Sequence, residues 1–129
     1  MRTLANTRKF RLSDSFVEPY KDKNVPWGPV GYVTYKRTYS RRLSEFDPDA
    51  TGSEEWYQTC RRVVEGMFNT QKEHVVRLGL EWNDSKAQRT AKDAYDRLFH
   101  LKWTPPGRGL WMMGTKFVEE KTAAGLFNC

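Results

Sequence analysis

The chain has 129 residues, of which 22 are Lys or Arg and 16 are Asp or Glu, so its formal net charge is +6 at pH 7. This length predicts one domain and excludes a two-domain enzyme of ordinary size. The mean hydropathy of −0.81 indicates a thin core, whereas the 14 % of aromatic residues argues against a disordered chain. The positive charge permits a nucleotide or nucleic-acid partner without demonstrating one.

Membrane and secreted classes are also excluded at this level. No window holds the ~18–20 apolar residues of a membrane helix, and the first ten residues lack the apolar stretch of a secretory signal. We therefore expect no membrane partner. The two cysteines, Cys60 and Cys129, are too few for a disulfide framework, so we expect a reducing, cytoplasmic location.

The N-terminal third predicts short elements separated by loops. We expect residues 1–10 to be a flexible N-terminus and residues 12–17 to form a short helix with Ser13 as its N-cap. Two prolines and two glycines between residues 25 and 31 predict a loop. Residues 32–39 have a β-prone composition that fits either a strand or an extended aromatic arm.

Two long helices are predicted in the middle of the chain. The first covers residues 53–78, with Gly79 as its stop, because apolar side chains recur at helical spacing at Trp56, Cys60, Val63, Val64, Met67, Phe68 and Val75. The second covers residues 85–101 and begins at a cap supplied by Asp84 or Ser85. Alanines line the first half of its expected buried face, which lets a neighbouring helix approach closely.

The last quarter of the chain contains loop residues and ends on an apolar segment. Residues 105–109 are rich in glycine but lack the Lys-Ser/Thr of a phosphate-binding loop, so we interpret them as a connector between a helix and a strand. One or two helical turns are expected between residues 115 and 121. Residues 126–129 are typical of the start of a buried strand, and we expect a chain that is cut off there.

Most candidate sites have an ordinary structural explanation. His74 and His100 have no partners at metal-ligand spacing, so we expect no metal. The adjacent acids at 54–55 and 119–120 are interpreted as solvated charge, because neighbouring helical residues do not point at a common atom.

The two cysteines differ in their setting. Cys60 lies on the apolar face of the first long helix, which predicts a buried hydrophobic residue. Cys129 stands at the end of an apparent strand, where active sites collect in α/β folds, so it is a candidate redox or nucleophilic thiol.

A basic and aromatic stretch supports an alternative function. Rings and cations are interleaved between residues 32 and 42, at Tyr32, Tyr35, Lys36, Arg37, Tyr39, Arg41 and Arg42. Single-stranded nucleic acid is bound by that combination. The alternative is therefore a small basic helical protein that binds single-stranded nucleic acid through residues 32–42, and a third hypothesis is a helical interaction module without chemistry.

A series of motifs carries a family resemblance. In chain order they are Leu12–Val17, Pro26–Pro29, Tyr35–Arg41, Glu54–Thr59, Arg62–Gly66, Lys102–Thr115 and Leu126–Cys129. The Pro-Pro-Gly-Arg-Gly-Leu-Trp and Arg-Thr-Tyr-Ser-Arg runs are the most specific of them. The series resembles the N-terminal part of the adenosylcobalamin-dependent ribonucleoside-triphosphate reductases, the monomeric class II ribonucleotide reductases, from about residue 10 onward.

The resemblance implies a fold and a reaction. Residues 11–129 would be the mainly α, helical N-terminal region that flanks a ten-stranded α/β barrel, ending at the start of the first barrel strand. The family converts ribonucleoside triphosphates to deoxyribonucleotides by radical chemistry. Adenosylcobalamin initiates that chemistry from a site outside this chain, and thioredoxin restores the cysteines that supply electrons.

The resemblance also implies roles for two residues. Cys129 matches the N-terminal member of the reducing cysteine pair, and Asn128 matches a residue at the substrate, although the family more often has Asn at the position of Phe127. Cys60 has no counterpart among the functional cysteines. The partner cysteine, the radical cysteine and the C-terminal pair belong to the missing C-terminal part of the reductase, so we expect this chain alone to be inactive. A split gene, an intein, a frameshift or an incomplete sequence would each explain the cut.

Overall fold

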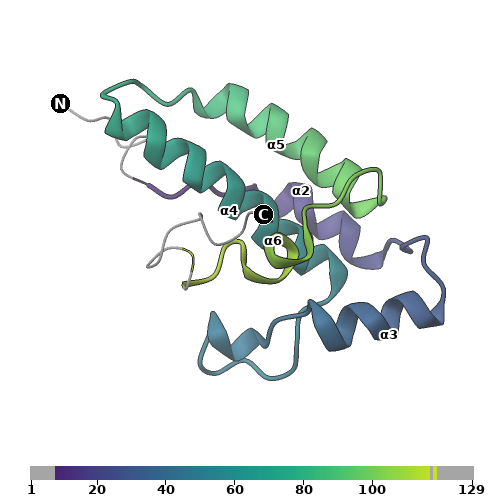
Figure 1. The fold of residues 1–129 in the computed structure, drawn as a ribbon. Coiled ribbons are helices and arrows are strands. Elements are labelled where there is room, and N and C mark those ends of the chain that lie inside the picture. The colour runs from purple at the N-terminus through teal and green to yellow at the C-terminus, as the bar shows by residue number, and fades with distance from the viewer. Residues whose placement is uncertain (1–7, 117, 119–129) are drawn as a thin grey trace.

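The computed structural model describes residues 8–116 and residue 118, and within them every regular element is a helix. In chain order these are α2 (Asp14–Val17), η1 (Glu18–Asp22), α3 (Pro29–Thr38), η2 (Leu43–Glu45), α4 (Trp56–Arg77), α5 (Asp84–Phe99) and α6 (Gly107–Met112). Helices α4 and α5 form a central antiparallel hairpin, with the shorter elements arranged around α4 (Figure 1). The mainly α prediction is confirmed for this part of the chain, whereas the strand expected at 126–129 lies outside the described residues.

Helix α4 begins later than its apolar pattern predicts. Glu55 takes the N-cap position and forms a capping box in which its backbone N–H donates to Gln58 Oε1 at 2.8 Å. Ser53 cannot belong to the helix because it forms an isolated bridge with Arg42. At the other end Gly79 has φ +77°, a left-handed conformation that favours glycine and confirms the predicted stop.

Helix α5 packs on α4 through its small residues. Ala87 and Ala91 are 7 % and 0 % exposed, which confirms that the alanine face is buried. The cap is Asn83, whose side chain accepts from the backbone N–H of Lys86 at 3.1 Å, so the expectation of Asp84 or Ser85 was wrong by one or two residues. At the far end of the helix, the indole of Trp56 donates to the carbonyl of Phe99 at 3.0 Å and joins the two helices.

The segment before α2 contributes to the core. Phe10, placed by the sequence in a flexible N-terminus, is 1 % exposed and its ring stacks on Phe68 with the centroids 5.2 Å apart. Residues 1–7 lie outside the described part. The predicted helix at 12–17 is present as α2, with Ser13 at the N-cap position but without a side-chain hydrogen bond.

Residues 32–38 are helical and Tyr39 is the C-cap of that helix, so both the strand and the extended arm were wrong. Helix α3 starts at Pro29, whose fixed φ suits a first helical turn. Within the described residues no strand lies beside it to pair with, and β-propensity depends on such a neighbour. As a helix, α3 buries Tyr35 against Trp27 and Trp56, with ring centroids 5.2 and 5.3 Å away.

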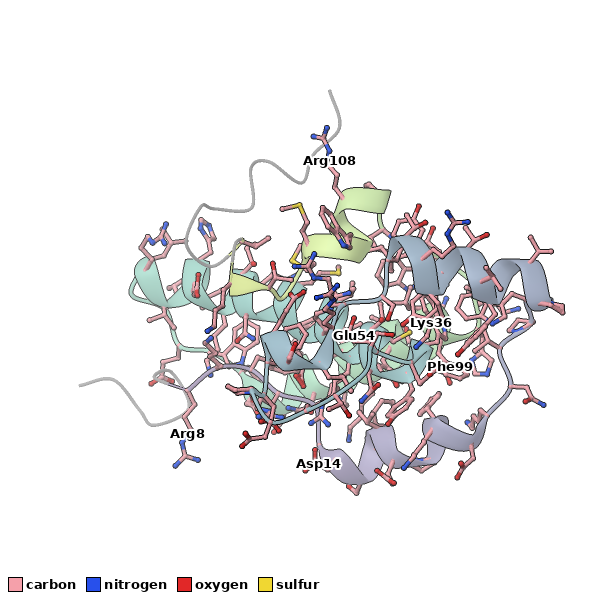
Figure 2. The ribbon with its side chains drawn as sticks, turned by 90° about the horizontal axis from the view of Figure 1, so that it is seen from below. Arg8, Asp14, Lys36, Glu54, Phe99 and Arg108 are labelled. Carbon is pink, nitrogen blue, oxygen red and sulfur yellow. The ribbon has the colours of Figure 1, made fainter. Side chains whose placement is uncertain are left out.

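The predicted connector at 105–109 was also partly wrong, because α6 begins inside it at Gly107. Figure 2 shows Arg108 pointing outward from this helix, whereas Glu54 lies in the interior of the molecule. The turn that follows α6 lies against α4 at Gly66 and Arg62. Among the described residues no helix is both long and apolar enough to cross a bilayer.

Candidate functional site

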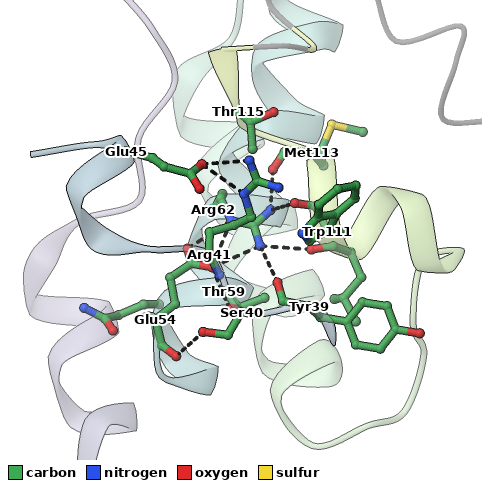
Figure 3. Close-up of polar contacts among 12 residues, drawn as sticks. Tyr39, Ser40, Arg41, Glu45, Glu54, Thr59, Arg62, Trp111, Met113 and Thr115 are labelled. Atoms are coloured by element: carbon green, nitrogen blue, oxygen red, sulfur yellow. Dashed lines mark hydrogen bonds and ion pairs between the residues drawn. The ribbon is translucent and has the colours of Figure 1, made fainter. Parts of the chain in front are cut away.

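A buried ion pair lies at the point where α3, α4 and α6 converge. Arg62 Nε donates to Glu54 Oε2 at 2.9 Å, and the two side chains are only 5 % and 3 % exposed (Figure 3). The interpretation of Glu54 as solvated charge was therefore wrong, although the side chain of Glu55 is half exposed as expected. Glu54 precedes the helix and points inward, a direction that the helical-neighbour argument did not consider. The other expected pair, 119–120, lies outside the described residues.

Glu54 fixes the chain after α3 to α4. Its carboxylate accepts from the backbone N–H of Arg41 and from Thr59 Oγ1, each at 3.0 Å. Its own backbone carbonyl accepts from Lys36 Nζ at 2.9 Å and from Ser40 Oγ at 2.7 Å. A buried carboxylate is tolerated only when its oxygens are matched by donors, and these contacts supply them.

Arg62 holds the end of α6. Its Nη2 donates to the carbonyl of Leu110 at 2.9 Å, and its Nη1 donates to the carbonyls of Trp111 and Met113 at 3.3 and 2.7 Å. The last carbonyls of a helix have no partner within the helix, and a cation is favourable at that end. Because the guanidinium also reaches Glu54, its N–H groups are directed at matched acceptors and the buried charge is balanced.

The backbones of α4 and the turn after α6 touch at two glycines. A Cβ built on Gly66 would lie 2.5 Å from the backbone nitrogen of Gly114. Gly114 has φ +79°, and a Cβ there would lie 2.4 Å from the carbonyl oxygen of Arg62. Neither position has room for a side chain, so the two segments cross in one arrangement.

A groove of about 960 Å³ lies along α4 between the N-terminal segment and Gly114. Arg61, Glu65, Asn69 and Glu73 are among the side chains that line it. Arg61 pairs with Glu65 at 2.7 Å, and burial raises the pKa of Glu65 against the opposing effect of Arg61. The charged side chains that line the groove thus partly neutralise one another.

The described residues lack a metal-binding cluster. They contain no group of three or more His, Cys, Asp or Glu side chains that could hold a metal ion. His100 Nδ1 lies 2.8 Å from the carbonyl of Asp96, as expected for a histidine at a helix end, and His74 is exposed. The thiol of Cys60 is fully buried. These donors do not fit a large cofactor, so its site is still expected elsewhere.

Sequence-predicted site residues fall into two groups. Asn128 and Cys129 lie outside the described residues, so their roles stay predictions. Cys60 is 0 % exposed, and burial raises the pKa of its thiol well above the usual range, which confirms a buried hydrophobic residue and not a nucleophile.

Three residues of the basic and aromatic stretch, Tyr35, Lys36 and Arg41, have internal partners. Tyr35 is 3 % exposed, and burial raises the pKa of its hydroxyl. Lys36 pairs with Glu55 at 3.0 Å. The guanidinium of Arg41 lies 4.8 Å from the centroid of the Trp111 ring. Rings and cations with such partners are not available to stack on bases or to bind the backbone of a single strand.

Sequence reasoning missed the pair formed by Glu54 and Arg62. One signal was present, because Arg62 interrupts an apolar helical face between Cys60 and Val63. A charged residue at such a position needs a buried partner. Nothing in the helical pattern identified Glu54 as that partner, since it lies before the helix begins.

Comparison with known proteins gives consistent matches. A family model described as the ribonucleotide reductase alpha domain matches residues 12–115. The chain is 42 % identical to a probable adenosylcobalamin-dependent ribonucleoside-triphosphate reductase of Dictyostelium discoideum, over 95 % of this chain and 16 % of that protein. It is 40 % identical to the adenosylcobalamin-dependent enzyme of Euglena gracilis, over 98 % of this chain and 17 % of that protein.

A solved structure shares the fold. The crystal structure of a B-12 dependent (class II) ribonucleotide reductase superposes with a TM-score of 0.75 at 35 % identity, covering 93 % of this chain and 16 % of that one. The chain thus spans about a sixth of the length of the relatives that it matches. The matched fold, the matched family model and the close relatives agree, and the chain belongs to the ribonucleotide reductase family, corresponding to the N-terminal part of its adenosylcobalamin-dependent, class II members.

Proposed function

We propose that this chain forms the N-terminal region of an adenosylcobalamin-dependent ribonucleoside-triphosphate reductase. The reaction replaces the 2′-hydroxyl of the ribose with hydrogen. Two protein thiols supply two electrons and two protons and become a disulfide, and the hydroxyl leaves as water. Adenosylcobalamin supplies the initiating radical from a site that we place outside the described residues.

Within this reaction the chain contributes Cys129 and Asn128. Cys129 is one thiol of the reducing pair, and thioredoxin or an equivalent dithiol restores it after each turnover. Asn128 contacts the substrate. A thiol pair can act in this way only if a second cysteine comes within bonding distance, and that cysteine belongs to the remaining part of the reductase.

The observation that carries the proposal is the agreement of sequence and fold over nearly the whole chain. Identity to the Dictyostelium reductase is 42 % over 125 residues, and the class II crystal structure superposes with a TM-score of 0.75. The alternative, binding of single-stranded nucleic acid through residues 32–42, has no comparable support because Tyr35 is buried and Lys36 is paired.

A hybrid reductase tests the proposal. In it, residues 1–129 of this chain replace the matching N-terminal segment of the Dictyostelium relative. With a ribonucleoside triphosphate, adenosylcobalamin and thioredoxin, we expect the hybrid to form the deoxyribonucleotide, measured by chromatography, and the 129-residue chain alone to form none. A folded hybrid without activity would contradict the proposal.

The two cysteines provide a matched pair of variants. Cys129→Ser in the hybrid should abolish multiple turnover with thioredoxin, because one thiol of the reducing pair is lost. Cys60→Ala should keep that turnover, because Cys60 is buried in the helical core. Retained multiple turnover in Cys129→Ser would remove the role given to this cysteine.

A further inference from the structure

We propose that Arg62 is a positioning residue of the reductase: it fixes the end of α6 on α4, and so fixes where the chain that carries Asn128 and Cys129 departs. This inference rests on the proposed function and deepens it. We assign Arg62 no contact with substrate or cofactor. It acts only through the backbone that it holds.

Helix α6 cannot fix its own position. It has six residues, Gly107–Met112, and helices far shorter than ~12–15 residues are not stable alone in water. Two of those residues are glycines, which favour the unfolded chain. The placement of this segment must therefore come from contacts outside the helix.

Arg62 supplies these contacts at the end of the helix. The carbonyls of Leu110, Trp111 and Met113 accept from it within 2.7–3.3 Å. Three carbonyls within four residues define both the position and the direction of the backbone. The ion pair with Glu54 also fixes the guanidinium of Arg62. If the end of α6 moves, the guanidinium therefore cannot move with it.

The α6 segment and the turn after it have only one way to lie on α4. Gly114 crosses Gly66 in backbone contact, and its φ of +79° turns the chain at that point. Thr115 continues the turn with its hydroxyl donating to the carbonyl of Met112 at 2.6 Å. The bonds from Arg62 and the glycine crossing thus specify one exit for the chain that runs on to Cys129.

Only arginine fits this role. The guanidinium is a planar fork that serves the carboxylate of Glu54 and several carbonyls at once. A lysine would keep the charge but would present one compact ammonium group that cannot reach acceptors on both sides. The Arg62→Lys change therefore keeps the positive charge but disrupts the hydrogen bonds to the carboxylate and the carbonyls.

The test uses the hybrid reductase with Arg62→Lys and, as the matched control, Arg61→Lys. Arg61 is the neighbouring arginine on α4, is also ion-paired, and contacts Asp14, Glu65 and the Leu12 carbonyl instead of α6. We expect Arg62→Lys to lower kcat by about 10- to 100-fold, since misplacement by ~1 Å has effects of that size, and to raise KM for the triphosphate, because Asn128 is displaced together with Cys129. Arg61→Lys should leave both parameters within twofold.

A second variant moves the same segment without touching Arg62. In Gly66→Ala the new methyl group displaces Gly114, and we expect the same loss of kcat and the same rise in KM. This variant decides the matter if Arg62→Lys does not fold. Hydrogen exchange in the 129-residue chain should accelerate at least tenfold at residues 111–116 in either variant, with α4 and α5 unaffected.

The outcomes separate this inference from the proposed function. An inactive but folded parent hybrid would defeat the proposed function itself. An active parent with kcat within twofold in a folded Arg62→Lys, or in Gly66→Ala, would overturn the positioning role while leaving the function intact. Equal acceleration of exchange along the whole α4–α5 hairpin would also overturn it, because that result indicates a general loss of stability.

Discussion

Arg61 and Arg62 are adjacent on α4 but bind opposite ends of the described chain. Arg61 donates to the carbonyl of Leu12 at 2.7 Å and pairs with Asp14 at 2.7 Å, whereas Arg62 binds carbonyls in and after α6. Consecutive helical residues point about 100° apart, so one helix can serve both segments. The two arginines thereby anchor the N-terminal segment and the exit of the chain to the same helix.

Arg61 controls the acidity of two carboxyl groups in opposite senses. Its hydrogen bond holds the pKa of Asp14 below the ordinary value of 3.8, while burial raises the pKa of Glu65 above 4.5 despite Arg61. In Arg61→Gln we expect the pKa of Asp14 to return toward 3.8 and the pKa of Glu65 to rise further. Titration of the carboxyl ¹³C shifts by NMR measures both. A fall in the pKa of Glu65 would contradict this account.

The raised pKa of Glu65 makes stability depend on pH. Between pH 4.5 and the raised pKa of Glu65, the folded state keeps a proton on Glu65 that the unfolded state has lost. The free energy of unfolding therefore falls as pH rises through this range. We expect Arg61→Gln to widen this window, because the charge that opposes the effect of burial is gone. Urea unfolding between pH 4 and 8 measures the slope. The double variant with Glu65→Gln is the control and should lack this contribution.

The glycine crossing can be tested against a glycine in open space. Gly114→Ala and Gly79→Ala both place a side chain at positive φ, which costs about 1–2 kcal/mol. Only at Gly114 does the new Cβ also meet backbone, the carbonyl oxygen of Arg62 at 2.4 Å, whereas nothing lies within 4 Å at Gly79. We expect Gly114→Ala to be the more destabilising in urea unfolding. Equal losses of unfolding free energy in the two variants would show that the contact between Gly114 and α4 adds no steric constraint.

Cys60 should be inert in the folded protein. Its side chain is fully buried, so a reagent cannot reach the sulfur. Burial also raises the pKa of its thiol, which disfavours the reactive thiolate. With iodoacetamide at pH 8, we expect peptide mass spectrometry to find Cys60 unlabelled in the native chain and labelled in urea. Labelling at the rate of a free thiol under native conditions would place this residue outside the core.

The contact between α4 and α5 depends on small residues. Ala91 is 0 % exposed, so Ala91→Leu adds three carbons where the helices meet and should cost about 1–3 kcal/mol of unfolding free energy. Arg89→Ala, on the exposed side of the same helix, should change it by less than about 0.5 kcal/mol. Urea unfolding of both variants checks the contrast, and similar values for the two would argue against close packing at Ala91.

Apolar periodicity was sufficient for the central hairpin. The spacing of side chains such as Val63 and Phe68 predicts a helical face, and that face is buried as predicted. Local composition was not sufficient for residues 32–39. Their side chains are β-prone, but the segment is mostly helical because Tyr35 packs against aromatic rings of the core. The ends of elements were also missed, since caps such as Asn83 depend on single hydrogen bonds.

The sequence by itself determined the central helices, the buried thiol of Cys60 and, through its ordered motifs, the family. Only the tertiary structure decided that Glu54 and Arg62 form a buried pair and that Arg62 holds the end of α6. The physical reason is one of range. Periodicity reports which face of an element is apolar, whereas a buried charge is specified by donors and acceptors from segments far apart in the chain, here Tyr39, Glu54 and Met113 around one guanidinium.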